Sequence, residues 1–402
     1  MRSIAVWVLL ILIFTIPWEN AITLSGIGTL TRVMGLVLIT MWLLAILAKG
    51  RIRKPNLFHL VFLLFIQVNI VSIFWTHDIT ATKERIISYI QLFIFVLILW
   101  DLFDKQNIFQ AGLQAYVLGA YVSIIGILYN YYNGVVVSPY GFNRNTGVNI
   151  NANDLALILS LGIPVAWHLA IINANRTKGF ILKIVNYAYI PAAFFSIVLT
   201  GSRMSLFVMV PVLVYILGTI RQLKIGIRLL VFSTLIGAMI ALQNYIPQSS
   251  IDRFTTIGAS IAERDLGGRV AIWFAASSVF SAHPLLGIGG GSLPAIIGGV
   301  AHNTFLSVLA ELGFIGFILF ILVLATVVYC AIHQSKKYSA LWLTILLIWA
   351  IGVSTLTWEA YKPTWLFMSL IVTSAYLWNH PMVSKPKNRR KNFNSLLIEP
   401  DV

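Results

Sequence analysis

The chain has 402 residues, of which 59% are apolar and only 10% are charged, and its mean hydropathy is +0.88. So few charges cannot cover the surface of a water-soluble domain, so this composition excludes a soluble globular enzyme. In a membrane protein the net charge of +15 is informative through the side on which each Lys and Arg falls. We therefore expect no nucleic-acid partner. A single cysteine excludes an intramolecular disulfide framework.

Long apolar runs occur along the whole sequence. Because a bilayer crossing takes about 20 apolar residues, they predict an all-α, polytopic integral membrane protein with about 12 transmembrane helices. The first run resembles a secretory signal but lacks a small-x-small cleavage site, so we expect it to be retained as a span. The expected spans are 3–18, 27–48, 57–75, 86–103, 111–129, 153–172, 184–200, 203–220, 226–243, 303–331, 339–357 and 364–378.

The distribution of charge predicts the topology. With these spans, Arg2, the even-numbered loops and the C-terminal tail together carry 19 of the 28 Lys and Arg residues but only 4 of the 13 acidic ones. The positive-inside rule then predicts that both termini are cytoplasmic. We expect a single membrane domain over 1–402, with an extracytoplasmic loop insertion at 244–302 and a basic cytoplasmic tail at 379–402 that meets anionic lipid.

The 244–302 segment contains two local patterns. From 269 to 281 it lacks Gly and Pro, which predicts a short helix at the membrane interface. The glycine-rich turn at 287–291 resembles a phosphate-cradling loop, but it lacks the Lys-Ser/Thr pair that follows such loops, so we do not expect a nucleotide there.

Two arginines at membrane edges are candidates for anion binding, because charges in such positions tend to line cavities. Arg203 follows a tight Thr-Gly-Ser hairpin and should lie at a helix start, where unpaired N–H groups attract anions and where Thr200 or Ser202 is expected to cap the helix. Arg269 opens the interfacial helix beside Gly268. Arg203 either reaches lipid headgroups or, with the helix start, makes a pyrophosphate-sized site, and Arg269 is either an anion ligand or a surface arginine.

His302 lies where the chain re-enters the membrane. Its ordinary pKa near 6.5 would let it accept a proton from a hydroxyl at neutral pH; the alternative is a satisfied interfacial histidine. Glu311 lies nine residues further on, on the opposite side of an ideal helix, so we expect it to pair with an arginine or a neighbouring helix. The polar loop at 130–152, which includes Arg144, either binds sugar or is simply polar.

The seven histidines show no metal-ligand spacing, so no metal site and no cofactor are predicted.

Several of these motifs occur together in a recognisable order: Thr200-Gly201-Ser202-Arg203, Gly267-Gly268-Arg269-x-x-x-Trp273, His283-Pro284-Leu285-Leu286-Gly287-Ile288-Gly289, and His302-Asn303-Thr304-Phe305-Leu306 with Glu311-Leu312-Gly313. This order resembles the O-antigen ligase and O-antigen polymerase superfamily over roughly 190–320.

The resemblance implies a glycosyltransferase-C-like membrane enzyme of the bacterial inner membrane that uses a polyprenyl-pyrophosphate-linked saccharide as donor. The acceptor would be lipid A-core in a ligase or a growing glycan in a polymerase. By the same resemblance, Arg203 and Arg269 would hold the donor pyrophosphate and His302 would be catalytic, with Glu311, Asn303 and Arg144 as possible supporting residues.

Two readings from other classes stay open. Twelve spans with both termini inside is also a common transporter plan, which would make the chain a lipid-linked glycan flippase. A non-catalytic scaffold would tolerate loss of Arg203, Arg269 or His302.

Overall fold

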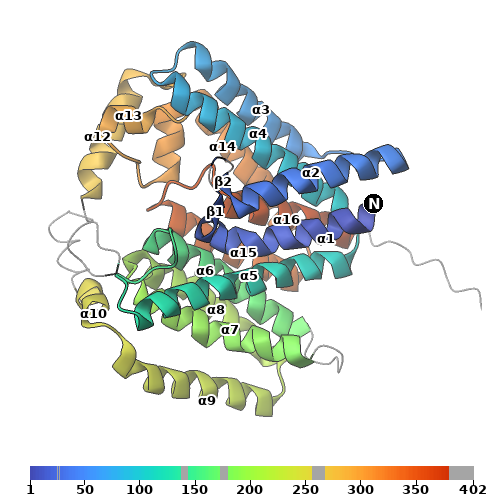
Figure 1. Ribbon diagram of the computed structural model, residues 1–402, viewed down its shortest axis with the longest axis vertical. Coiled ribbons are helices and arrows are strands. Elements are labelled where there is room, and N and C mark those ends of the chain that lie inside the picture. Colours follow the sequence, from blue (N-terminus) through green and yellow to red (C-terminus); the bar gives the residue numbers. More distant parts are fainter. Residues whose placement is uncertain (25, 27, 137–143, 173–179, 256–267, 380–402) are drawn as a thin grey trace, which may run out of the picture.

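The computed structural model describes residues 1–24, 26, 28–136, 144–172, 180–255 and 268–379. About 80% of these residues are helical (Figure 1), and the predicted all-α polytopic membrane fold is confirmed. One two-stranded ribbon, β1 (Thr23–Leu24) and β2 (Gly28–Thr29), joins the first two helices. The helices are α1 (Arg2–Thr15), α2 (Leu30–Lys49), α3 (Leu57–Val71), α4 (Ile79–Leu102), α5 (Gln106–Tyr132), α6 (Ala152–Ile172), α7 (Phe180–Leu199), α8 (Arg203–Thr219), α9 (Ile225–Leu242), α10 (Gln248–Thr255), α12 (Arg269–Ala282), α13 (Leu293–Ile297), α14 (Thr304–Ile332), α15 (Lys336–Val353) and α16 (Lys362–Asn379).

A helix occupies each of the twelve predicted spans. Within the described ranges, ten are long and apolar enough to cross a bilayer, and these ten do not include α9 and α16. The predicted interfacial helix at 269–281 is present as α12. The tail beyond Asn379 lies outside the described residues.

The start of α4 was predicted too late. The helix begins at Ile79 rather than at 86, because the Asp78 carboxylate accepts a hydrogen bond from the Ala81 N–H at 3.0 Å and so caps an earlier turn. This extension brings Arg85 inside the helix.

Helix α6 is the centre of one half of the bundle. Seventeen of its 21 residues are buried, and it packs against α5, α7, α8 and α15. Its sequence is apolar on every side from Leu155 onward, as expected for a helix with no lipid-facing stripe. Because α6 is held on all sides, the polar residues at its N-terminal end, Asn153 and Asp154, have fixed positions.

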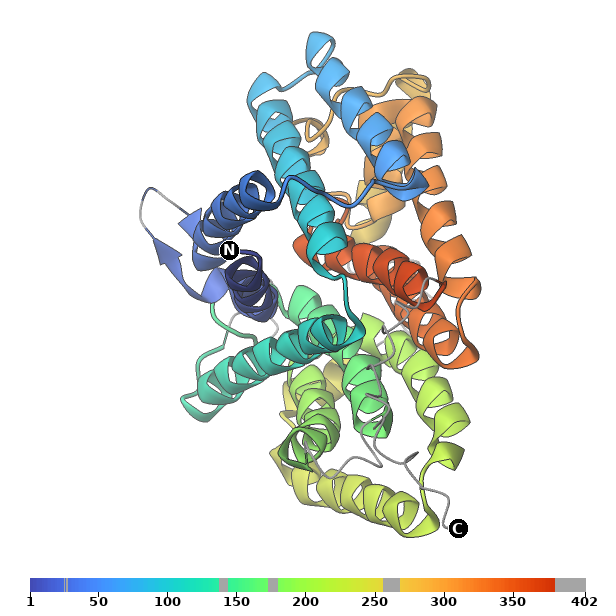
Figure 2. The same cartoon turned by 90° about the vertical axis from the view of Figure 1, so that its right-hand side faces the viewer.

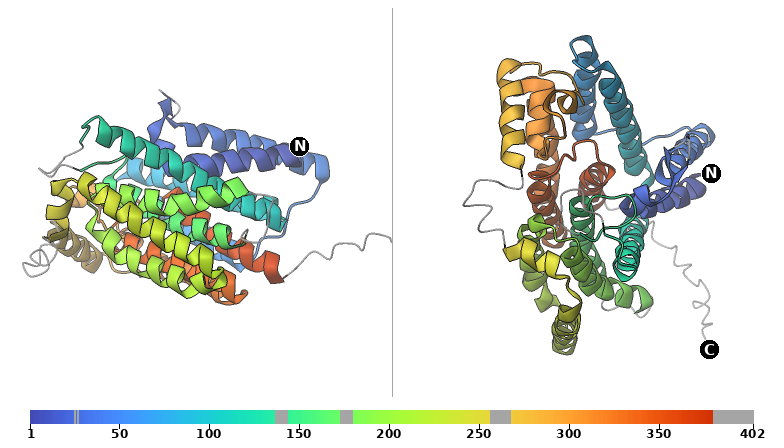
Figure 3. Two further views of the ribbon diagram at one scale, coloured as in Figure 1. Left: turned by 90° about the horizontal axis from the view of Figure 1, so that it is seen from below. Right: turned by 60° about the vertical axis from the view of Figure 1, so that its left-hand side comes forward.

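The two ends of the bundle carry different groups. Arg2 pairs with Asp101 at 3.0 Å, and the rings of Trp100 and Tyr376 pack with centroids 4.9 Å apart, so α1 begins and α16 ends beside the C-terminal end of α4. In Figure 3 (left), α10 and α12 lie at the opposite end of the bundle from the N-terminus.

Helices α1 and α2 form a hairpin at one side of the bundle, beside α4 and α5 (Figure 2).

Candidate functional site

Two separate segments of the chain converge on the short hairpin between α7 and α8. The Nε–H of Arg144, from the α5–α6 loop, donates to the carbonyl of Thr200 at 2.9 Å. The Nε–H of Arg253, from α10, donates to the next carbonyl, that of Gly201, at 2.9 Å. Arg203 is the first residue of α8, directly after this hairpin. The hairpin backbone therefore holds two arginines close to a third.

Gly201 is required for this arrangement. Its φ of +56° lies in the left-handed region, and a Cβ there would approach the Arg253 Cδ to 3.1 Å.

The predicted cap of α8 was wrong. The Thr200 hydroxyl donates back to the Ile197 carbonyl at 2.6 Å, and Ser202, although it is the N-cap residue, makes no side-chain capping hydrogen bond. The Ser202 hydroxyl is buried with no hydrogen-bond partner among the described residues. The Thr200 hydroxyl accepts from the Ser202 N–H at 3.2 Å, one residue before the helix, so neither side chain caps the first N–H groups of α8.

Arg269, the first residue of α12, completes the group, which we call the arginine cluster: Arg144, Arg203, Arg253 and Arg269. Burial lowers the pKa of Arg144 to about 9, and the positive charges of Arg253, Arg269 and Arg203 add to this effect. The pKa of Arg269 is also lowered, by burial and then by Arg203 and Arg253. These guanidinium groups therefore repel one another over short distances, and a bound polyanion would relieve that repulsion.

Arg144 is also fixed from the side of α6. Its Nη2 donates to the Asn153 Oδ1 at 2.8 Å, which joins the cluster to the N-terminal end of the central helix. The neighbouring Asp154 accepts a hydrogen bond from the Trp358 indole at 2.8 Å, and the Trp358 backbone N–H donates to the Thr304 hydroxyl at 2.8 Å. These hydrogen bonds connect the start of α6 to the start of α14, which begins two residues after His302.

His302 adopts a left-handed backbone conformation, with φ of +50°. The Trp273 indole of α12 donates to the carbonyl of Ala301 at 3.0 Å, and the Asn303 side chain caps α14 by accepting from the Leu306 N–H at 3.1 Å. Burial and the positive charge of Arg269 lower the pKa of His302. The imidazole is therefore neutral at neutral pH and lies within electrostatic range of the arginine cluster.

Glu311 belongs to a different charged group. Its carboxylate lies 3.9 Å from Arg85 of α4 and accepts from the Gly291 N–H at 2.7 Å. Arg85 also pairs with Glu359, which accepts a hydrogen bond from Ser307 at 3.4 Å. The expectation that Glu311 pairs with an arginine rather than with His302 agrees with this geometry.

The glycine-rich turn packs against a break in α14. Gly313, with φ of +61° and ψ of −164°, interrupts the helix, and the N–H of Phe314 donates to the carbonyl of Pro284 at 2.8 Å. In the other direction, the Gly289 N–H donates to the Glu311 carbonyl at 2.9 Å. A Cβ on Gly287 would lie 2.4 Å from the Glu311 backbone. These contacts give the turn a structural role beside the start of α14.

Of the predicted site residues, the structure brings Arg203, Arg269, Arg144 and His302 together, places Asn303 as the cap beside His302, and places Glu311 elsewhere. The sequence gives no indication that Arg253 and Trp358 belong to the site. Nothing in their spacing could have identified them, since their partners are 52 and 204 residues away along the chain. Across the described residues, no group of three His, Cys, Asp or Glu side chains is placed to hold a metal ion.

The chain is thus an all-helical, multi-pass membrane protein with a cationic site at one end of its bundle. Residues 188–321, about a third of the chain, match the family model described as O-antigen ligase. This match confirms the predicted resemblance to that superfamily, and it supports a membrane enzyme of the O-antigen ligase or polymerase type. No curated protein matches the chain. The matched region includes Arg203, Arg253, Arg269 and His302, whereas Arg144 lies outside it.

Proposed function

We propose that the protein is a membrane glycosyltransferase that moves a glycan from a polyprenyl-pyrophosphate donor to an acceptor hydroxyl on lipid A-core. We assign the site to the extracytoplasmic side of a bacterial inner membrane, with both termini in the cytoplasm. The observation that carries the proposal is the arginine cluster with a neutral histidine beside Arg269. The family match supports the general enzyme type.

The proposed chemistry uses the positive charges to stabilise the leaving group. Guanidinium groups bind phosphate oxygens in a bidentate manner, so the cluster would hold the diphosphate and neutralise the charge that develops on it. His302 would take the proton of the acceptor hydroxyl while its oxygen bonds to the anomeric carbon. The bond from that carbon to the diphosphate breaks at the same time, and polyprenyl pyrophosphate leaves. Attack opposite the leaving group would invert the anomeric configuration, with arginines rather than a metal ion supplying the positive charge.

A polymerase of the same superfamily is the second candidate, with a growing glycan as the acceptor. Some polymerases of this type carry an arginine followed after ten residues by glycine in two outward loops. In this chain the corresponding position after Arg144, Arg253, Arg264 and Arg269 holds Leu155, Arg264, Ala275 and Phe280, so the glycine is absent, which favours a ligase. A lipid-linked glycan transporter is the candidate from another class.

One assay separates these candidates. The purified protein is supplied with a labelled polyprenyl-pyrophosphate saccharide, with and without lipid A-core. Label on lipid A-core supports the ligase, a ladder on the polyprenyl carrier supports the polymerase, and movement across vesicles without transfer supports the transporter.

Matched variants test the residue assignments. Arg203→Ala and Arg269→Ala should abolish transfer, whereas Arg221→Ala, after the other end of α8, should not. His302→Ala should stop transfer while donor binding persists, and His333→Ala, at the other end of α14, is its control. Turnover like the wild type in both arginine variants would disprove the donor-site assignment.

A further inference from the structure

A pocket of about 120 Å³ lies between the α1–α2 hairpin and α4, apart from the arginine cluster. Most of its wall is aliphatic, with Leu12, Leu36, Ile39 and Ile98 among the lining residues. The volume is smaller than the roughly 300–1,000 Å³ of sites that enclose a small molecule. It therefore suits a segment of an extended hydrocarbon chain better than a sugar or a nucleotide.

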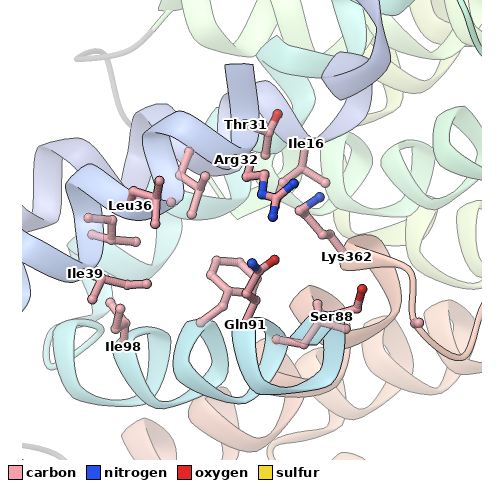
Figure 4. Close-up of a pocket in the computed structure, with 15 residues that line it drawn as sticks. Ile16, Thr31, Arg32, Leu36, Ile39, Ser88, Gln91, Ile98 and Lys362 are labelled. Atoms are coloured by element: carbon pink, nitrogen blue, oxygen red, sulfur yellow. The ribbon is translucent and has the colours of Figure 1, made fainter. Parts of the chain in front are cut away.

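The polar groups of the pocket gather at one end. Figure 4 shows the Arg32 guanidinium and the Lys362 ammonium pointing into that end, with the Gln91 amide and the Ser88 hydroxyl nearby, whereas Leu36, Ile39 and Ile98 lie at the other end. The pocket is thus amphipathic along its length. Its shape and polarity match a lipid, with a headgroup at the cationic end and a chain between the helices.

The charges at the polar end leave one positive charge unmatched. The Lys362 ammonium pairs with the Glu19 carboxylate at 2.6 Å. Arg32 is exposed, and within the described part of the chain no carboxylate forms a salt bridge with it. Arg32 and Lys362 with Glu19 therefore sum to +1, which complements the single negative charge of a phosphodiester and falls short of the charge on a pyrophosphate.

The pocket also adjoins the segment that supports the candidate site. Ala360 and Lys362 line the pocket, and Trp358, two residues before Ala360, contacts Thr304 at the start of α14 and Asp154 at the start of α6. A lipid in the pocket would therefore contact the loop between α15 and α16. This loop also hydrogen-bonds to the starts of α6 and α14, close to His302.

We propose that this pocket is a binding site for a monoanionic phospholipid of the bilayer, with its phosphate at Arg32 and Lys362 and one acyl chain between α1, α2 and α4. The site is separate from the donor site, and its occupant comes from the surrounding membrane.

The test measures retained lipid on the full-length protein by native mass spectrometry. The detergent-purified, delipidated protein is titrated with dioleoyl-phosphatidylglycerol and, separately, with dioleoyl-phosphatidylcholine. The wild type should bind the first phosphatidylglycerol about fivefold more tightly than phosphatidylcholine, which is the factor expected when one unmatched basic side chain meets a headgroup with a net charge of −1 instead of a zwitterion whose choline cation offsets the phosphate. Equal affinity for the two lipids would overturn the proposal.

Two variants locate the binding. Arg32→Gln should remove the preference for phosphatidylglycerol, whereas Arg51→Gln, at an exposed arginine outside the pocket, should not. Gly35 lines the pocket and a Cβ there would meet nothing within 4 Å, so Gly35→Phe should fill the pocket and abolish binding of the first lipid. Gly218→Phe, at a glycine of α8 with equally open space, is the control, and Gly35→Leu serves if the phenylalanine variant does not fold.

Two further outcomes would overturn the proposal. Unchanged phosphatidylglycerol binding in a folded Gly35 variant would place the lipid elsewhere and overturn the proposal. Binding of a polyprenyl phosphate to the wild type in preference to phosphatidylglycerol, with that binding lost in the Gly35 variant, would assign the pocket to a polyprenyl lipid and overturn the proposal too. Because glycan transfer is not measured, this result is independent of the proposed enzymatic function.

Discussion

Replacing His302 with glycine separates the role of its side chain from the role of its backbone. At φ of +50°, an L-residue carries a conformational cost of about 1 kcal/mol that glycine does not. Glycine in turn loses about 0.5–1 kcal/mol more backbone entropy on folding. The two effects nearly cancel, so we expect the free energy of unfolding of His302→Gly to lie within about 1 kcal/mol of the wild type. His302→Ala retains the backbone cost and is the less suitable variant.

The effect on turnover should be much larger. If His302 accepts the proton of the acceptor hydroxyl, its loss should lower the transfer rate by about 10²- to 10⁴-fold. The assay compares transfer with donor binding and with the melting temperature, which should change by no more than a few degrees. Normal melting with less than a tenfold loss of rate would refute the catalytic assignment. A melting temperature lowered by about ten degrees would instead refute the backbone argument.

The pH profile offers a check on the same residue. Burial and Arg269 lower the pKa of His302 below 6.5, so the wild-type rate should decline as pH falls and the imidazole becomes protonated, with the midpoint of that decline below pH 6.5. Arg269→Gln removes a positive charge, which raises the pKa of His302, so the decline in the residual rate should begin at higher pH. A decline at the same pH in both proteins would contradict the proposed electrostatic coupling.

Three further predictions concern other parts of the molecule. Inorganic pyrophosphate at 100 times its dissociation constant should stabilise the protein by about 2.7 kcal/mol in thermal melts, and Arg253→Gln should weaken its binding; an unchanged affinity would exclude Arg253 from the anion site. Gly313→Ala should destabilise the protein by about 3 kcal/mol or more, because its Cβ would lie 2.3 Å from the Leu285 carbonyl oxygen at a φ of +61°; Gly218→Ala is the control, and equal melting of the two would contradict the close contact. A chelator should leave the transfer rate unchanged, and a loss that Mg²⁺ restores would show that a metal ion takes part.

Apolar periodicity and length predicted the membrane helices well, because a lipid-facing span leaves a long continuous signal in the sequence. The start of α4 was missed because its signal is short: one aspartate, Asp78, caps an extra turn in a polar stretch that reads as a loop. The α8 cap was mispredicted for a related reason. Composition favours Thr200 or Ser202, but the hairpin geometry decides where each hydroxyl points.

The candidate site was predictable only in part. Arg203, Arg269 and His302 stand out as charged residues at membrane edges, and their motifs are local. The partners that fix the cluster are backbone carbonyls, which carry no sequence signature, so Arg253 could not be distinguished from other loop arginines. The pairing of Arg85 with Glu311 joins residues 226 positions apart, and only the packing of α3, α4 and α14 brings them together.

The hairpin at Thr200 and Gly201 bears on whether the proposed activity could be transferred to another protein. Arg144 reaches it from outside the region that matches the O-antigen ligase model, and it is anchored in turn on α6. A graft of 188–321 into another helical scaffold would therefore carry three of the four guanidinium groups, but neither Arg144 nor Asn153, which positions it. Chimeras between relatives should exchange 144–321 as a unit.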